Sequence, residues 1–307
     1  MTADQTGRAS PTGFTGHVGV IGVGIMGGPM ARNLLKAGAA VTVHHRSEER
    51  VRGLLNQGAT WAGSPRELAS ECKIIVLMLG DAPQILEVLN GPDGIAAGIT
   101  APATLVICSS ISAGDACRIA ARAEELTGGR LRTIDAPVSG GEEGAIAGNL
   151  SIMVGGDPQD YARAAPVLQA CGRPILLGPL GAGSVAKACN QLIVAATVMA
   201  IGEASVIAHR SGIDVAKLLE LLSGGYAGSR ILETRARRFA EEDYAPSGMA
   251  KFMVKDLAAA QDAASSAAVD AGQLRYLQQA FTQLVEAGHG DEDISVTRAY
   301  VSEKSIA

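Results

Sequence analysis

The sequence lacks the residue patterns typical of disulfide-rich, zinc-binding and nucleic-acid-binding proteins. Its five cysteines are scattered, contain no Cys-x-x-Cys pair and leave one unpaired, which argues against a disulfide framework and a zinc site. The five histidines show no ligand spacing beyond the adjacent His44 and His45, so no metal is expected. The net charge of -5 provides no basic excess for a phosphate backbone, and we expect no nucleic acid partner.

Hydrophobic segments that direct secretion or cross a membrane are also missing. Residues 1–16 are polar, without the apolar stretch of a signal peptide, and we expect them to form a disordered leader. The longest apolar candidate, residues 192–208, is interrupted by Glu203 and predicts a buried helix rather than a membrane span. We therefore expect a cytoplasmic protein with no membrane partner.

The length of 307 residues allows about two domains, and the pattern changes near residue 183. Over residues 17–183, short β-rich runs alternate with Ala-rich helical stretches, which predicts right-handed crossovers and a parallel sheet. The predicted fold class is α/β, with a doubly wound N-terminal domain. The expected strands are residues 17–21, 40–44, 74–79, 105–108, 131–135, 151–154 and 175–177.

After residue 183 no strand is expected, and apolar residues recur at helical spacing. This pattern predicts an all-helical C-terminal domain over residues 184–307. Its first helix, residues 184–210, is apolar almost all round, so we expect it to be buried against a partner subunit in a homodimer or homotetramer. Further helices are expected at residues 214–223, 229–241, 249–268 and 272–287.

A glycine-rich turn, Gly22-Val23-Gly24-Ile25-Met26-Gly27, joins the first strand to the first helix. Gly22 permits a tight turn, Gly24 lets the backbone approach a pyrophosphate, and Gly27 lets the helix pack on the strand. The amides at the helix amino terminus complete a phosphate site. A purely structural turn is the alternative, but the position of this turn in the alternating pattern favours a Rossmann-type dinucleotide-binding domain over residues 17–183.

The end of the second strand indicates which dinucleotide is bound. An acid for the adenine ribose usually stands about twenty residues after the glycine turn, whereas this sequence has His44-His45-Arg46-Ser47. Arg46 is placed to hold a 2′-phosphate, Ser47 to add a hydroxyl, and His45 belongs to the adenosine pocket. Alternatively, Arg46 only stacks on adenine or points to solvent. We expect NADP(H) to be preferred, with NAD(H) possible.

Residues 135–141 follow a predicted strand at its carboxyl end, where ligands of open α/β sheets bind. The amides of Gly140 and Gly141 and the hydroxyl of Ser139 suit a carboxylate. An ordinary turn has the same composition, and the residues alone leave both interpretations open.

The long helix carries three polar residues near its start. Lys187, Asn190 and Gln191 stand at i, i+3 and i+4, which puts them on one face. A lysine among such small and apolar neighbours is either solvated or held in a cleft for a purpose. The spacing alone does not decide between these possibilities.

Taken together, these segments resemble the β-hydroxyacid dehydrogenases, the family of 3-hydroxyisobutyrate dehydrogenase and tartronate semialdehyde reductase. Four motifs match in order, and they extend over nearly the whole chain. They include a Met-Gly and a Pro-Met-Ala that ordinary dinucleotide turns lack. The motifs are residues 22–33 (GVGIMGGPMARN), 135–141 (DAPVSGG), 183–191 (GSVAKACNQ) and 255–257 (KDL).

The resemblance implies an NAD(P)-dependent oxidoreductase that transfers a hydride to or from a small β-hydroxy acid or semialdehyde. Lys187 is then the acid–base group: it gives a proton to the carbonyl oxygen in reduction and takes the hydroxyl proton in oxidation. The residues expected to bind this carboxylate-bearing substrate are Ser139, Gly140, Gly141, Asn190 and Gln191.

The resemblance also implies cofactor contacts beyond the glycine turn. Lys255 reaches toward the cofactor, Leu79-Gly80 lines it after the third strand, and Ser110 lies near the nicotinamide. The family usually has Leu-Pro where this chain has Leu79-Gly80. The expected cofactor residues are Gly22, Val23, Gly24, Ile25, Met26, Gly27, His45, Arg46, Ser47, Leu79, Gly80, Ser110 and Lys255.

Three alternatives keep a related architecture: a non-catalytic NADP(H)-binding protein, an imine reductase and a 6-phosphogluconate type of enzyme. The presence of Lys187 argues against the first two, and the short chain argues against the third. Gln191 leans toward the tartronate semialdehyde reductase branch, whereas that branch tends to carry an acid where this chain has His45. The substrate, of the 2-hydroxy-3-oxopropionate or 3-hydroxyisobutyrate type, and the direction stay open.

Overall fold

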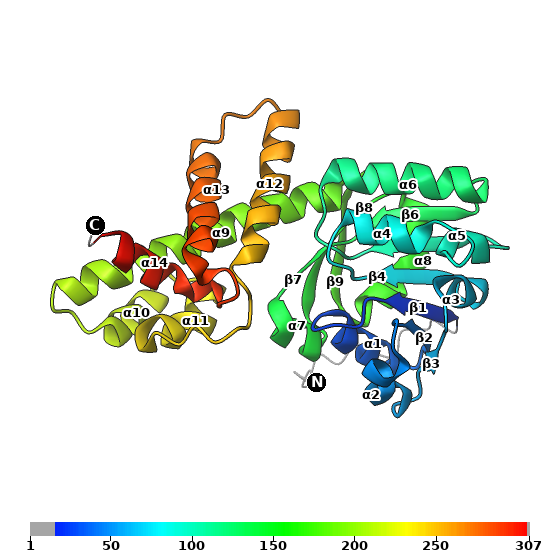
Figure 1. Ribbon diagram of the computed structural model, residues 1–307, viewed down its shortest axis with the longest axis horizontal. Helices are drawn as coiled ribbons and strands as arrows, with labels where there is room; N and C mark the ends of the chain where they lie inside the picture. The colour runs from blue at the N-terminus through cyan, green and yellow to red at the C-terminus, as the bar shows by residue number, and fades with distance from the viewer. Residues whose placement is uncertain (1–15, 306–307) are drawn as a thin grey trace, which may run out of the picture. The chain divides into compact units, whose positions relative to one another are not determined.

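The computed structural model describes residues 16–305 and divides into two compact units, Met1–Lys187 and Ala188–Ala307 (Figure 1). We call them the N-terminal and the C-terminal unit and describe each by itself. Of the expected leader, only Gly16 lies within the described residues.

The N-terminal unit is built on one sheet, which has nine strands within residues 16–305. The strand order is β3-β2-β1-β4-β5-β6-β8-β7, and β9 pairs with β8. The strands are β1 (His17–Ile21), β2 (Ala40–His44), β3 (Thr60–Trp61), β4 (Ile74–Leu77), β5 (Ala103–Ile107), β6 (Leu131–Asp135), β7 (Val138–Ser139), β8 (Leu150–Gly155) and β9 (Gly172–Gly178).

Helices cover both faces of this sheet (Figure 1). They are α1 (Gly27–Lys36), η1 (Glu48–Val51), α2 (Arg52–Leu55), α3 (Pro65–Glu71), α4 (Ala82–Leu89), α5 (Ile95–Gly98), α6 (Ala113–Thr127), α7 (Gly141–Ala147) and α8 (Pro158–Gln169). One hydrophobic cluster joins the sheet to α1, α2, α7 and α8, and a second joins it to α3, α4, α5 and α6. Because each buried Val, Leu or Ile contributes about 1.5–3 kcal/mol, these two layers dominate the stability of the unit. The predicted doubly wound fold is confirmed.

The sheet is parallel from β3 through β6, but β8 and β9 run the other way. The parallel direction expected for these last two strands is therefore wrong. Between β6 and β8 the chain forms only the short β7 and the seven-residue α7, with Gly140 and Gly141 at positive φ. Such a short connection enters β8 at the end of the sheet where β6 stops, so β8 runs antiparallel to β6. A parallel pair needs a longer crossover that returns the chain to the opposite end of the strands.

Local hydrogen bonds explain where several elements begin or end. Ser64, Asp81, Ser112 and Asp157 each accept a backbone N–H in the first turn of α3, α4, α6 and α8. The strand expected to reach Leu79 ends two residues earlier, because the Leu79 N–H donates to a side chain instead of the ladder.

The C-terminal unit is helical, as predicted. α9 (Ala182–Arg210) begins in the N-terminal unit and continues into this one. Figure 1 shows α12 and α13 side by side, and a hydrophobic cluster joins α9 to the later helices. The further elements are α10 (Val215–Ser223), α11 (Arg230–Glu241), α12 (Lys251–Ser266), α13 (Gly272–Leu284), η2 (Val285–His289), η3 (Ile294–Val296) and α14 (Thr297–Lys304).

α9 also corrects the expectation that no segment reaches the length of a membrane span. It has 29 residues and, by length and composition alone, could cross a membrane. The central helix of a packed unit has the same properties. Ala195, Val198 and Met199 are buried in the C-terminal core, and the Thr297 hydroxyl donates to the Val198 carbonyl oxygen at 2.9 Å. Packing within the unit therefore accounts for the apolar residues on this buried face of α9.

Candidate functional site

The turn between β1 and α1 needs glycine for steric reasons. Gly22 has φ +94°, and a Cβ on it would lie 2.2 Å from the Met78 carbonyl oxygen. A Cβ on Gly27 would lie 1.9 Å from the Gly22 carbonyl oxygen, so strand and helix approach too closely for any side chain. Gly24 differs, because within residues 16–305 no atom outside its own chain neighbours would lie within 4 Å of its Cβ. The backbone at Gly24 therefore borders open space that a ligand can approach.

The amino terminus of α1 favours an anion at this open space. Its first turn carries no acidic residue, so the partial positive charge of the helix end is not neutralised by its own side chains. Val23 and Ile25 lie on the rim of a hollow of about 210 Å³ beside the turn, which two arginines, Arg32 and Arg50, and one carboxylate, Glu142, also line. The local charge balance suits the phosphates of a dinucleotide.

The segment after β2 is fixed by hydrogen bonds around His45. The Ser47 N–H donates to His45 Nδ1 at 3.0 Å, and Trp61 Nε1 donates to the His45 carbonyl oxygen at 3.2 Å. Arg46 points away from these contacts: its guanidinium lies 3.3 Å from Glu87 Oε1 on α4, with the two side chains 82% and 65% exposed. Glu87 was not predicted, because nothing in the local sequence links it to Arg46.

The two segments expected to line the cofactor after β4 and β5 are joined. The Leu79 N–H donates to Ser109 Oγ at 2.8 Å, and Ser109 is only 1% exposed, while the next residue, Ser110, is half-buried. The Gly80 N–H donates to Gln84 Oε1 at 3.4 Å. A proline has no N–H to donate, so this bond is one the usual Leu-Pro sequence could not make.

The expected carboxylate-binding loop connects β7 to α7. Ser139 is half-buried at the end of β7, and Gly140 and Gly141, with φ +140° and +65°, are exposed. The first turn of α7 carries Glu142 and Glu143, both exposed. These charges oppose an anion at the end of α7, so a substrate carboxylate at this loop would rely on the two glycine amides and the serine hydroxyl.

Lys187 is half-buried near the start of α9 and belongs to the same unit as the glycine turn. Three residues earlier on this helix, the Ser184 N–H donates to the Asp135 carboxylate at 2.6 Å. Asp135 is the first residue of the DAPVSGG motif at residues 135–141, and the sequence alone predicted no role for it. The start of the helix that carries Lys187 is thus tied to the end of β6.

In the C-terminal unit, hydrogen bonds connect Asn190 and Gln191 on α9 with Lys255 on α12. Asn190 Nδ2 donates to Gln191 Oε1 at 2.8 Å, and Gln191 Nε2 donates to Asp256 Oδ2 at 2.6 Å. Lys255 Nζ donates to the other oxygen of Asp256 at 2.8 Å. Asp256 is 8% exposed and holds this group together, a role that could not be predicted from the sequence alone. The expected contact of Lys255 with the cofactor stays a prediction.

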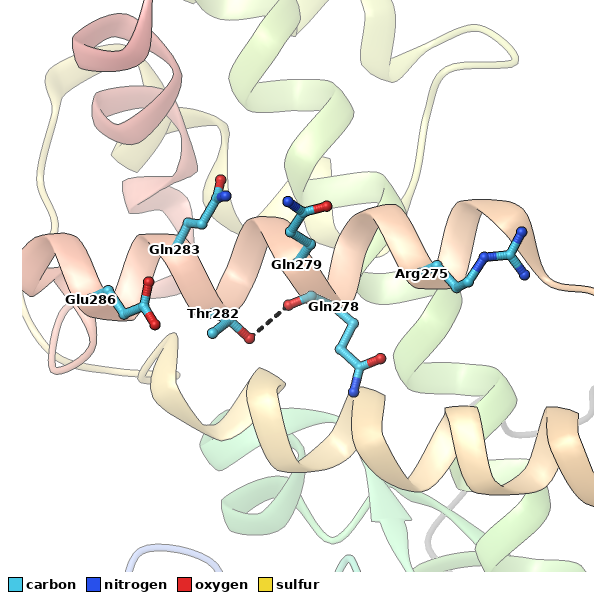
Figure 2. Close-up of a pocket in the computed structure, with 6 residues that line it drawn as sticks. All are labelled: Arg275, Gln278, Gln279, Thr282, Gln283 and Glu286. Atoms are coloured by element: carbon cyan, nitrogen blue, oxygen red, sulfur yellow. Dashed lines mark hydrogen bonds between the residues drawn. The ribbon is translucent and has the colours of Figure 1, made fainter.

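A hollow of about 520 Å³ on α13 and its continuation coincides with none of the predicted residues. Its lining side chains all come from this one helix, and Figure 2 shows them pointing to different sides of it. Ligand sites need polar groups that converge, so this surface does not offer one. Among residues 16–305, no three His, Cys, Asp or Glu side chains are grouped in a way that could hold a metal ion.

Comparison with known proteins identifies the family. Residues 17–189 match the NAD binding domain of 6-phosphogluconate dehydrogenase, and residues 181–300 match the NAD-binding domain of NADP-dependent 3-hydroxyisobutyrate dehydrogenase. The chain is 37% identical to 2-hydroxy-3-oxopropionate reductase of Escherichia coli, over 91% of this chain and 94% of the relative. The chain belongs to the β-hydroxyacid dehydrogenase family.

Further relatives agree with this assignment. NAD-dependent L-serine dehydrogenase of Pseudomonas aeruginosa is 36% identical over 92% of this chain and 96% of its own length. The crystal structure of 3-hydroxyisobutyrate dehydrogenase from Salmonella typhimurium superposes with a TM-score of 0.84 at 31% identity, covering 92% of this chain and 99% of that one. The expected family and the expected dependence on NAD(P)(H) are confirmed, and the protein is a hydroxy acid dehydrogenase.

The N-terminal unit fits the cofactor of this β-hydroxyacid dehydrogenase. The open space at Gly24 and the acid-free amino terminus of α1 are the features that a pyrophosphate requires. At the same carboxyl edge of the sheet, Leu79 and Ser110 follow β4 and β5, which run parallel to β1, and nucleotides bind at this edge in doubly wound folds.

Proposed function

We propose that this β-hydroxyacid dehydrogenase interconverts a small β-hydroxy acid and its semialdehyde, with Lys187 as the acid–base group. The supporting observation is the location of Lys187: half-buried, in the nucleotide-binding unit, on a helix start anchored by a buried carboxylate. Relatives are named for 2-hydroxy-3-oxopropionate, 3-hydroxyisobutyrate and L-serine, so we propose a three- or four-carbon acid of this kind as substrate.

Lys187 would handle the proton. When bound, NAD(P)H supplies the hydride. In reduction, the Lys187 ammonium stabilises the negative charge that gathers on the carbonyl oxygen and gives that oxygen a proton from Nζ. In oxidation, the neutral amine takes the proton of the hydroxyl group.

Other residues would orient the substrate. We propose that the Ser139 hydroxyl and the amides of Gly140 and Gly141 hold the carboxylate. Asn190 follows Lys187 by three residues on α9 and would hold the hydroxyl group beside it. Because Gln191 is fixed by Asp256, the amide of Asn190 has a defined orientation for this role.

We propose NADP(H) as the preferred cofactor. Arg46 and Ser47 follow β2, where the 2′-position of the adenine ribose lies in doubly wound folds, and the position of the usual acid is occupied by His45. The exposed guanidinium of Arg46 suits a bidentate contact with a phosphate.

We also propose that the enzyme is a homodimer or homotetramer in the cytoplasm. Ile193 and Ile207, fourteen residues apart and therefore on one side of α9, are 66% and 67% exposed. Covering them with a second subunit removes this apolar surface from water. A monomer in multi-angle light scattering would contradict the assembly. All five cysteines are free thiols, which fits a reducing compartment.

A substrate panel tests the proposed reaction. Tartronate semialdehyde, methylmalonate semialdehyde, succinate semialdehyde, glyoxylate and sulfolactaldehyde would be assayed with NADPH and NADH by loss of absorbance of the reduced cofactor. We expect one of the β-semialdehydes with NADPH to give the highest kcat/KM. Glyoxylate, which has no β-carbon, serves as the control. Equal rates for glyoxylate and the semialdehydes would contradict the proposed substrate class.

A further inference from the structure

The start of α9 is capped by a residue from another part of the chain. α9 begins at Ala182, and Gly181 before it has no side chain to accept the amides of the first turn. The Asp135 carboxylate takes that role. Its Oδ1 accepts the N–H of Gly181 at 2.8 Å, and its Oδ2 accepts the N–H of Ser184 at 2.6 Å. One remote carboxylate thus satisfies two amides that helices usually cap with their own side chains.

The surroundings of Asp135 leave little freedom to its carboxylate. Asp135 is 0% exposed. A Cβ on Gly155, its partner in the β6–β8 pairing, would lie 2.4 Å from Oδ1, and a Cβ on Gly183 would lie 3.0 Å from Oδ2. Burial raises the pKa of Asp135, and the hydrogen bonds from the start of α9 oppose that rise. Two glycines are therefore needed to admit the carboxylate, and close packing holds it in place.

Asp135 connects the two segments of the N-terminal unit that carry the proposed substrate chemistry. It ends β6, and the chain then leads through Pro137 into β7 and Ser139. Its hydrogen bonds hold the first turn of α9, where Lys187 follows Ser184 by three residues, about 4.5 Å along the helix axis. A shift of this carboxylate would change the distance between these two segments.

We infer that Asp135 is a positioning residue, which sets the location of Lys187 relative to the Ser139 loop by anchoring the start of α9 to the end of β6. The inference rests on the proposed role of Lys187. Because the side chain is fully buried, Asp135 acts through the backbone of α9 and does not contact the reacting atoms. Loss of the Asp135 carboxylate should therefore slow the chemical step more than it weakens cofactor binding.

The variant Asp135→Asn tests this inference with little change in shape. The asparagine NH₂ group faces one of the two backbone N–H donors, so one of the two hydrogen bonds is lost. With the best substrate of the panel, we expect kcat to fall about 10–100-fold, which a displacement near 1 Å can cause. The Kd of NADPH should change by less than about threefold. The primary isotope effect with 4-deuterated NADPH should rise, because the chemical step then limits turnover.

Asp160→Asn is the matched control. Asp160 is also a buried carboxylate of the N-terminal unit, and it pairs with Arg132 on β6 and Arg163 on α8. This variant should lower the melting temperature but keep the wild-type kcat and isotope effect. A loss of folded protein lowers kcat without changing the isotope effect, so the two causes can be separated.

A second variant displaces the carboxylate without removing it. In Gly155→Ala the added Cβ overlaps Asp135 Oδ1, and we expect the same loss of kcat and the same rise in isotope effect. If Asp135→Asn and Gly155→Ala both fail to fold while Asp160→Asn folds, Asp135 serves folding only and the inference is overturned.

Lys187→Ala, measured in parallel, separates the two proposals. If Lys187→Ala loses activity while Asp135→Asn keeps the wild-type kcat, the lysine role stands and the positioning role of Asp135 is wrong. If Lys187→Ala keeps the wild-type kcat, the proposed function itself fails, and the inference about Asp135 fails with it.

Discussion

Removal of the Arg46 guanidinium should change the cofactor preference of the enzyme. The pair between Arg46 and Glu87 joins two exposed side chains, and such surface pairs contribute only about 0–1 kcal/mol. A 2′-phosphate can therefore displace Glu87 at little cost. Hydrogen bonds to charged groups contribute about 1.5–3 kcal/mol, so that after the loss of the surface pair about 0.5–3 kcal/mol is left for the contact between Arg46 and the phosphate.

This energy corresponds to about a 2–150-fold increase in the Kd of NADPH for Arg46→Ala, since 1.4 kcal/mol is tenfold. NADH has no 2′-phosphate, and its Kd should change by less than about threefold. The assay is a titration of cofactor fluorescence at one fixed salt concentration, because exposed charges are screened. Equal losses for NADPH and NADH would refute the 2′-phosphate contact and leave only stacking on adenine.

Glu87→Gln provides the complementary variant. It removes the carboxylate that competes with the phosphate for Arg46, so NADPH should bind up to about fivefold more tightly. If Glu87 acts through Arg46, its effect should vanish in the Arg46→Ala background, which a double-mutant cycle measures. An undiminished effect in that background would indicate direct repulsion of the phosphate instead.

The remaining predictions concern the glycine turn and a histidine in the C-terminal unit. Gly27→Ala forces a backbone shift and should lower the free energy of unfolding by about 1–3 kcal/mol, measured by thermal denaturation. Gly24→Ala should keep the wild-type melting temperature and bind the cofactor more weakly. A Gly27→Ala variant as stable as the wild type would contradict the steric clash. Partial burial alone would lower the pKa of His289, but its hydrogen bonds with Glu303 and Glu292 outweigh burial and raise the pKa. The stabilisation by the protonated histidine is present in acid and is lost as the pH rises through the raised pKa. His289→Gln should therefore lower the free energy of unfolding by about 1 kcal/mol at pH 6 and by less at pH 9. An equal loss at both pH values would rule out the charged pair.

Sequence patterns located most of the fold because local rules define its elements. β1, β2 and β6 have the predicted bounds, since each is a short apolar run between turn residues. The reversal of β8 and β9 was missed, because strand direction depends on the path of the chain and not on the residues within a strand. The start of α9 was placed two residues late, since Asp135, which caps it, lies 46 residues before Gly181 in the sequence.

The residues of the candidate site likewise fall into those that could be predicted from the sequence and those that could not. Gly22, Gly24 and Gly27 could be assigned from spacing, because their roles depend on neighbouring backbone. The partners Glu87 and Asp256 could not, since they lie 41 residues from Arg46 and 65 residues from Gln191 and follow no periodic pattern. Only the folded chain shows which carboxylates hold the polar groups that the motifs contain.

The most direct test of the proposed chemistry is the kcat of Lys187→Ala at saturating cofactor and substrate. We predict a fall of about 10²-fold or more, because the variant has no group to give a proton to the carbonyl oxygen. The Kd of NADPH should stay within about threefold of the wild-type value. A variant that turns over at the wild-type rate would remove Lys187 from the mechanism.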